Sequence, residues 1–240
     1  MAIVRDRKFL DSDGTVSRKL LFSCINEHRL EVEARLNKLN DYYEGAHKIL
    51  DRTFKNKNIP NNKIVCNHAE YITDLATGYV FGVPISYSGE GADALNINFT
   101  EIDEDSHNNE LALDLSIFGR TYELIYMNTD EKPKIELASL SPLNTFLVVD
   151  TSVKEKPMFA VHYYPNITLE NTIDNYTVEV YTESEKLIYE VPTLNSECSI
   201  VKEVDIEEHY FNGIPIIEYT NNKKARGDFE GVIALIDAYN

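Results

Sequence analysis

The segment Asn61–Pro84, NNKIVCNHAEYITDLATGYVFGVP, carries the most regular hydrophobic pattern of the chain. Its apolar residues share one face at helical spacing: Val65, Ala69, Ile72, Leu75, Ala76 and Tyr79. Asn61 can cap the start of such a helix, and Gly78, or Gly82 followed by Pro84, can end it. The pattern predicts a buried central helix that belongs to the core and carries no chemistry. Both neighbouring regions are expected to pack on it.

Four further helical patterns surround this segment. One runs from Ser17 through Ile25, and a second runs from Val32 to Tyr43 and stops at Gly45, so the two predict an amphipathic helical pair. A densely apolar helix is expected over Asn109–Phe118, buried on most sides and closed by Gly119. The last begins at the N-cap Asp228 and places Phe229, Val232, Ile233, Ile236 and Tyr239 on one face. Two polar stretches, the linker Lys55–Asn62 and the acidic run Glu101–Glu110, are expected to be loops.

Strand patterns fill the second half of the chain. A short strand Ile85–Tyr87 precedes them, and alternation predicts strands over Thr121–Met127 and Ile135–Leu137, joined by a turn at Asn128–Lys132. The run Thr145–Val149, TFLVV, is apolar on both faces and so predicts a central strand, with Met158–Tyr164 as its neighbour. A separate β patch is expected to contain two hairpins: one pairs 176–180 with 187–191, and one turns at Asn212-Gly213 into an edge strand marked by Pro215.

These patterns predict an α+β fold in which helices pack on small antiparallel sheets and hairpins. Residues 1–16, with a turn at Asp11–Gly14, are expected to be an N-terminal arm, and residues 17–240 a single domain. Within it, residues 17–119 are helical, 120–220 are rich in β-structure, and 228–240 begin a helix. Because no stop signal follows that helix, we expect it to be truncated at Asn240 and the natural protein to continue.

Charge and cysteine content narrow the function classes. A formal net charge of −17 disfavours a surface that grips nucleic acid, because phosphate binding needs clustered Lys and Arg. Cys24, Cys66 and Cys198 are odd in number, which favours free thiols in a reducing compartment. No apolar run approaches the roughly 20 residues that span a bilayer, and the N-terminus lacks a signal-peptide core. We therefore expect a protein that is intracellular at synthesis and has no membrane partner.

Two clusters invite a metal hypothesis, and neither is complete. Cys66, His68 and Glu70 include the His-x-Glu of zinc deaminases but lack the Pro-Cys-x-x-Cys partner. Asp103, Asp105 and His107 faintly suggest a calcium loop, yet its sixth position is Asn108 instead of Gly. No phosphate-binding glycine loop or nucleophile elbow occurs. The sequence thus predicts no catalytic, cofactor-binding or metal-binding residue, no cofactor and no enzyme activity. The remaining enzyme hypothesis is a hydrolase, whose catalytic carboxylates no motif identifies.

Three segments, in order and at similar spacing, resemble the portal proteins of tailed bacteriophages, the head–tail connectors, in their siphophage and prophage type. The first is LNKLNDYYEGAHKIL leading through NIPNNKIVCNHAEYITDLATGYVFGVPISY. The second is NNELALDLSIFGRTYELIYMNTDEKPKIELASLSPLNTFLVVDT, and the third is GIPIIEYTNNKKARGDFEGVIALIDAYN. The resemblance covers about Leu30–Asn240.

The resemblance implies a structural subunit of the virion with no catalytic residues. Family members form a dodecameric ring of identical subunits at the capsid portal vertex, dock the terminase, pass double-stranded DNA without sequence recognition and join tail-connector proteins. Assembly takes place in the host cytoplasm. The matching region is the N-terminal part of the α+β wing, so the stem, clip and crown would lie outside this chain. The resemblance leaves the inter-subunit residues unknown. The alternative reading is a self-contained acidic α+β interaction or adaptor module.

Overall fold

A computed structural model describes residues 2–11, 15–55, 58, 60–128, 133–195 and 202–240. The chain forms two compact units: unit 1 comprises Met1–Glu33 and Tyr122–Glu218, and unit 2 comprises Ala34–Thr121 and Tyr219–Asn240. Helices and sheets occur together, which confirms the α+β class. Four predicted features lie wholly or partly outside the described residues: the turn at Asp11–Gly14, the linker 55–62, the turn 128–132 and Cys198.

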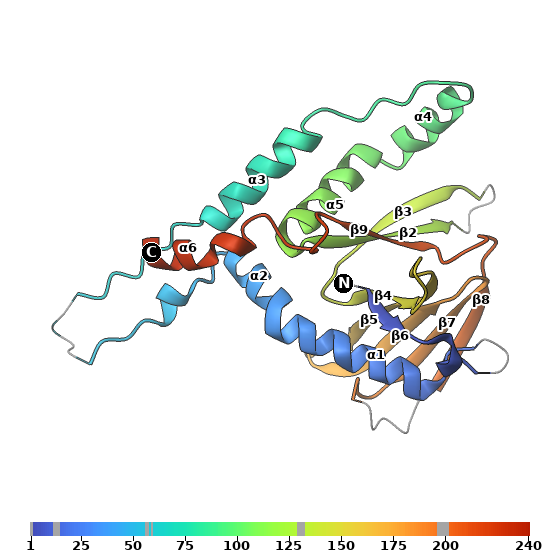
Figure 1. Cartoon of the computed structure of the whole chain (residues 1–240), viewed down its shortest axis with the longest axis horizontal. Coiled ribbons are helices and arrows are strands. Elements are labelled where there is room, and N and C mark those ends of the chain that lie inside the picture. The colour runs from blue at the N-terminus through green and yellow to red at the C-terminus, as the bar shows by residue number, and fades with distance from the viewer. Residues whose placement is uncertain (1, 12–14, 56–57, 59, 129–132, 196–201) are drawn as a thin grey trace. The chain divides into compact units, whose positions relative to one another are not determined.

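The helices and strands follow one another as in Figure 1. The α-helices are α1 (Arg18–Glu31), α2 (Asn37–Tyr43), α3 (His68–Phe81), α4 (Ala92–Glu101), α5 (Glu104–Phe118) and α6 (Ile233–Tyr239), and a π-helical turn, Val32–Leu36, joins α1 to α2. The strands are β1 (Ile3–Arg5), β2 (Arg120–Met127), β3 (Ile135–Leu140), β4 (Thr145–Asp150), β5 (Pro157–Ile167), β6 (Ile173–Tyr181), β7 (Glu185–Val191), β8 (Lys202–Glu208) and β9 (Ile216–Thr220).

Unit 1 is built on a six-stranded sheet of order β1-β4-β5-β6-β7-β8. Strands β4 to β8 pair antiparallel, with Phe146 opposite Val161. At the other edge β1 runs parallel to β4 and places Ile3 beside Val148. Residues 3–5, within the stretch expected to be an arm, are thus a strand of the sheet. The Arg7 guanidinium donates to Asp150 at the end of β4 (Nε to Oδ2, 2.8 Å) and fastens the segment after β1.

The two faces of this sheet are covered by different elements (Figure 1). Side chains of α1, among them Phe22 and Ile25, pack with Phe146 and Val148 of β4 on one face. On the other face Leu147 and Val149 pack with Tyr122 and Ile216 of the three-stranded sheet β3-β2-β9. Because successive strand residues point to opposite faces, a strand covered on both sides needs apolar residues at consecutive positions, as Phe146–Val149 of the predicted TFLVV strand provide. All six residues of β4 are buried.

A buried histidine connects α1 to the Ser-Pro turn before β4. His28 hydrogen-bonds through Nδ1 to the Tyr163 hydroxyl (2.9 Å) and through Nε2 to the Pro142 carbonyl (3.0 Å). Its ring also lies against Phe146, 4.8 Å between centroids. Since both ring nitrogens have partners, this polar residue is buried without an unsatisfied group.

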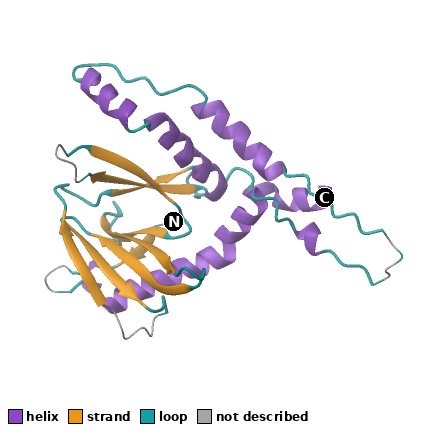
Figure 2. Cartoon of the chain, turned by 180° about the vertical axis from the view of Figure 1, so that it is seen from behind, coloured by secondary structure: helices purple, strands orange, loops and turns teal. Residues whose placement is uncertain are grey.

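Unit 2 contains helices α2 to α6, and α3 packs along α5 in an antiparallel pair (Figures 1 and 2). The helix predicted over the segment 61–84 exists, although it begins at His68 with Asn67 as its N-cap instead of Asn61. Its burial was predicted wrongly. Only Ala69 and Thr73 are buried, because α5 and the other helices cover one edge of the apolar stripe and leave the rest exposed.

Four other local predictions are wrong. Residues Ile85–Tyr87 are irregular instead of a strand. Most of the acidic run Glu101–Glu110 is helix, with Glu104 and His107 buried and the other acidic side chains exposed. The hairpin across Asn212-Gly213 does not form. β8 pairs with β7 in the large sheet, whereas β9 joins the small sheet, and the predicted separate β patch is part of the six-stranded sheet. β9 is an edge strand, as Pro215 indicated.

The acidic side chain of Asp114 lies on α5, a helix that is largely apolar around it. Burial, with a smaller contribution from Glu110 one turn earlier, raises the pKa of Asp114 from 3.8 to about 7. The folded state therefore holds this proton more tightly than the unfolded state. Stability is lost as the pH rises between these two values, and the loss is complete above the folded pKa.

We expect Asp114→Asn to stabilise the protein at pH 8 by about 2 kcal/mol, because the amide removes a buried negative charge. At pH 4 the gain should nearly vanish. Thermal unfolding at the two pH values measures the difference. Asp105→Asn, an exposed position on the same helix, is the control and should give no gain at pH 8. An equal gain at both pH values would contradict the assignment.

Candidate functional site

The residues considered for zinc serve to cap and dock α3. Asn67 caps the helix by accepting from the Glu70 backbone N–H (3.3 Å) and donates through Nδ2 to the Glu70 carboxylate (2.9 Å). The backbone N–H of Cys66 donates to Asn240 Oδ1 (2.8 Å), and the His68 ring meets Tyr239 edge-on, 5.0 Å between centroids. These contacts hold the start of α3 against the end of α6 and do not form a metal site.

The residues considered for calcium lie at the start of α5. Asp103 occupies the N-cap position with a left-handed backbone (φ 53°), Asp105 lies in the first turn, and His107 is buried. A helical backbone does not wrap its side chains around one ion as a calcium loop does. Within the described ranges no group of three or more His, Cys, Asp or Glu side chains is placed to hold a metal ion.

The most tightly constrained part of unit 2 is where the C-terminal end of α5 meets the segment 221–230. A Cβ on Gly227 would clash with the Ile117 carbonyl and lie 2.8 Å from that of Ser116. A Cβ on Gly119, whose φ is +81°, would clash with the backbone of Ala225 and Arg226. Only glycine permits two backbones to approach so closely.

Hydrogen bonds hold this backbone contact in place. The backbone N–H of Asp228 donates to the Ser116 carbonyl (2.8 Å), and the Ser116 hydroxyl donates to the Asp228 carboxylate (2.7 Å). The backbone N–H of Asn221 donates to the Gly119 carbonyl (3.0 Å). Asp228 was expected to cap the last helix, but its carboxylate binds α5 instead. The N-cap position of α6 is Val232, and a 3₁₀ turn at Glu230–Val232 precedes the helix.

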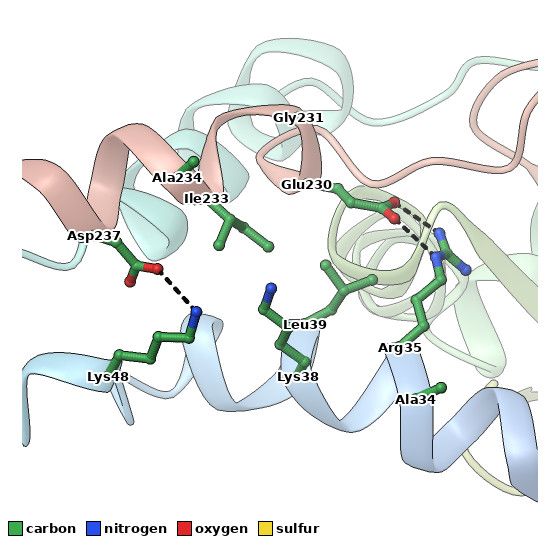
Figure 3. Close-up of a pocket in the computed structure, with 10 residues that line it drawn as sticks. All are labelled: Ala34, Arg35, Lys38, Leu39, Lys48, Glu230, Gly231, Ile233, Ala234 and Asp237. Atoms are coloured by element: carbon green, nitrogen blue, oxygen red, sulfur yellow. Dashed lines mark hydrogen bonds and ion pairs between the residues drawn. The ribbon is translucent and has the colours of Figure 1, made fainter. Parts of the chain in front are cut away.

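Arg35 joins three segments of unit 2 through one guanidinium group (Figure 3). It binds the Glu230 carboxylate in a two-point fork, Nε to Oε1 at 2.9 Å and Nη2 to Oε2 at 2.7 Å. The same Nη2 donates to the carbonyls of Phe118 (3.0 Å) and Ala225 (2.7 Å). Burial opposes ionisation of Glu230, yet the hydrogen bonds and charge of Arg35 outweigh it and lower the pKa of Glu230.

A cleft of about 420 Å³ lies beside this ion pair, between the α2 region and α6. Figure 3 shows its second ion pair, Lys48 Nζ to Asp237 Oδ2 at 3.5 Å. The Tyr42 hydroxyl also donates to Asp237, and burial, followed by this contact, raises the pKa of Tyr42. The carboxylates of the cleft are engaged with cations or hydroxyls that fix α6 in place. This arrangement is suited to holding the last helix.

A cavity of about 770 Å³ lies in unit 1. Its walls are largely apolar and include Tyr126, Met127 and Phe211. Lys186 lies among its polar groups, 3.1 Å from Glu179 and 3.5 Å from Glu207. Lys186 thus bridges two carboxylates, and among the described residues that line the cavity no nucleophile is paired with a base.

Sequence reasoning missed most of the Arg35 site. Gly119 was recognised as the stop of a helix, but the sequence pattern indicated no role for Arg35 or Gly227. The available signal was the run GDFE, residues 227–230, which places a glycine and two acidic side chains within four residues just before the last helix. The partner, Arg35, is 195 residues away from Glu230 in the sequence, so no local pattern could pair them.

Comparison with known protein families places nearly all of these elements in one family. Residues 22–240 match the family described as phage portal protein, SPP1 Gp6-like. The chain belongs to this family. A search of curated proteins finds no match. The match includes Arg35, both glycines of the close contact and Glu230, so the site that holds the last helix lies within the family region.

Membership of the portal family establishes a structural role in the phage portal and confirms the resemblance. At the level of the family, portal proteins are structural and not enzymes, and they work in oligomers at the capsid vertex of the virion. No helix in the described ranges is both long and apolar enough to cross a membrane.

We expect Gly227→Ala to destabilise the portal chain by about 2 kcal/mol or more, because the added Cβ meets backbone carbonyls that have no free space to move into. Gly231→Ala is the matched control. No atom lies within 4 Å of a Cβ at Gly231, so alanine there should be neutral or slightly stabilising. Thermal or urea unfolding of both variants measures the effect, and equal stabilities would refute the close contact.

We expect Arg35→Met to cost about 2–3 kcal/mol, since it leaves a partly buried carboxylate and two carbonyls without their donor. A double-mutant cycle with Glu230→Gln should give a coupling above about 1 kcal/mol. Lys48→Met is the control: its ion pair is solvent-exposed and should contribute under about 0.5 kcal/mol. Additive effects of the Arg35 and Glu230 changes would show that the fork contributes nothing.

Proposed function

We propose that this portal protein contributes the wing region of a head–tail connector ring, made of identical subunits, at the capsid vertex of a tailed phage or prophage. The observation that carries the proposal is the family match over residues 22–240. In this role the chain is a mechanical part. Its Arg35–Glu230 ion pair and its glycine contacts hold the elements of unit 2 together. The stem, clip and crown of the ring are assigned to parts of the portal outside this sequence.

The proposal includes the passage of double-stranded DNA without sequence recognition. A net charge of −17 supports it, because a negatively charged wall repels phosphates and offers few cations that would retard sliding. Terminase during packaging, the capsid shell and the tail-connector proteins are the further partners that we assign to the ring. Assembly would take place in the host cytoplasm before the ring becomes part of the virion.

The direct test is negative-stain electron microscopy of the full-length gene product, together with its mass in solution. We expect rings with a central hole and a mass that is a whole-number multiple of the subunit mass. A full-length protein that stays monomeric at micromolar concentration and shows no ring would refute the proposal.

A second prediction concerns DNA. The chain should not retard a random-sequence duplex in a gel-shift assay at about 100 mM salt, because its net charge of −17 repels the phosphates of DNA. A basic duplex-binding protein in parallel lanes provides the positive control. Tight, salt-dependent retention of the duplex by this chain would contradict the assignment of a non-adhesive channel part.

A further inference from the structure

Helix α3 carries a row of large apolar side chains that no described part of its own unit covers. Tyr71, Leu75 and Tyr79 follow one another at intervals of four residues and therefore lie on one line of the helix. They are 64%, 59% and 89% exposed. Ala69 and Thr73, the buried residues of α3, lie off this line, on the part of the helix that its own unit covers. We call Tyr71, Leu75 and Tyr79 the α3 ridge.

Two more apolar side chains are exposed near the end of α3, outside the line of the ridge. Val80 near the end of α3 and Val83 just after it are also largely exposed. A row of three large exposed apolar side chains, with two exposed valines close by in the sequence, is more than scattered surface residues account for. A single soluble unit gains nothing from exposing such a surface to water, which indicates that it is covered in the assembled protein.

The absence of charge at this surface limits what can cover it. From Leu75 to Gly89 the sequence contains no charged residue, although charged residues make up 26% of the whole chain. DNA is disfavoured, because no Lys or Arg is present to meet its phosphates. Glu70 and Asp74 flank only the first half of the ridge, so the part free of charge is centred on Tyr79.

The segment that follows α3 is anchored, so the surface exists before any partner binds. The Tyr87 hydroxyl donates to the Glu104 carboxylate (2.6 Å), and the Tyr87 ring lies 5.0 Å from that of Phe99. The hydrogen bond to Glu104, followed by burial, raises the pKa of Tyr87 to about 12, so this donor remains protonated at all physiological pH values. A preformed surface loses little conformational entropy when it is covered.

We propose that the α3 ridge is a contact surface for a second copy of this chain. The proposal rests on the proposed function, because a ring of identical subunits supplies that copy. Charge explains why the contact uses this surface: two copies, each at −17, repel one another wherever acidic faces meet, and an uncharged apolar surface lets them approach. Burying the exposed apolar side chains provides the attraction.

The test compares two tyrosines with the same exposure in the full-length protein. Tyr79 and Tyr210 are both 89% exposed, and Tyr210 lies outside the ridge. We expect Tyr79→Glu to weaken assembly at least tenfold in subunit concentration, as measured by mass photometry or native mass spectrometry. Tyr210→Glu should assemble like the wild type. The melting temperature of the 240-residue chain should be unchanged in both variants, which shows that the loss is not unfolding.

Photo-crosslinking through a benzophenone side chain at position 79 provides an independent readout. Crosslinks between two copies of the chain support the proposal, whereas crosslinks only to another capsid or tail protein overturn it. If the wild type forms rings and Tyr79→Glu assembles as well as Tyr210→Glu, the ridge proposal fails while the proposed function stands. If the wild type itself forms no ring, the proposed function fails.

Discussion

The fold of unit 2 depends on one close contact between two stretches of backbone. The end of α5 and the segment 225–227 approach each other so closely that neither Gly119 nor Gly227 has room for a Cβ. That distance lets the Asp228 and Asn221 backbone N–H groups reach carbonyls of Ser116 and Gly119. The path of the last helix begins here, because α6 follows directly from this contact through the turn at Glu230–Val232.

Arg35 completes this contact electrostatically. The last carbonyls of a helix lack partners within it and carry partial negative charge, so a cation is favourable there. The planar Arg35 guanidinium donates to the Phe118 carbonyl at the end of α5 and also to the Glu230 carboxylate. Lysine could not replace it, because a single ammonium does not present a planar fork to a carboxylate while reaching two carbonyls. One side chain thereby links α5, the segment before α6, and its own helical segment.

The sequence allowed the type of most long elements to be predicted, and it failed where distant segments decide the outcome. TFLVV predicted a strand covered on both faces, since a short run of consecutive apolar residues in a strand places apolar side chains on both sides of the sheet. The Asn212-Gly213 hairpin was predicted wrongly because a turn signal indicates only that the chain bends. It does not indicate which strands pair, and in the structure β8 pairs with β7 and β9 with β2. The acidic run was misassigned because solvated helices and solvated loops have the same composition. Arg35 and Gly227 acquire their roles only when residues far apart in the sequence meet.

The burial of α3 shows a deeper limit of periodicity. An apolar stripe states that a face avoids water, but it does not state which chain covers that face. On α3 the unit covers the edge at Ala69 and Thr73 and leaves Leu75 and Tyr79 in solvent. In a protein that works as an oligomer, the same hydrophobic force that builds a core also builds the contacts between subunits. The sequence of a portal subunit should therefore contain apolar stripes that its own unit covers only in part. The uncovered part of the stripe then marks the surface that contacts the next subunit.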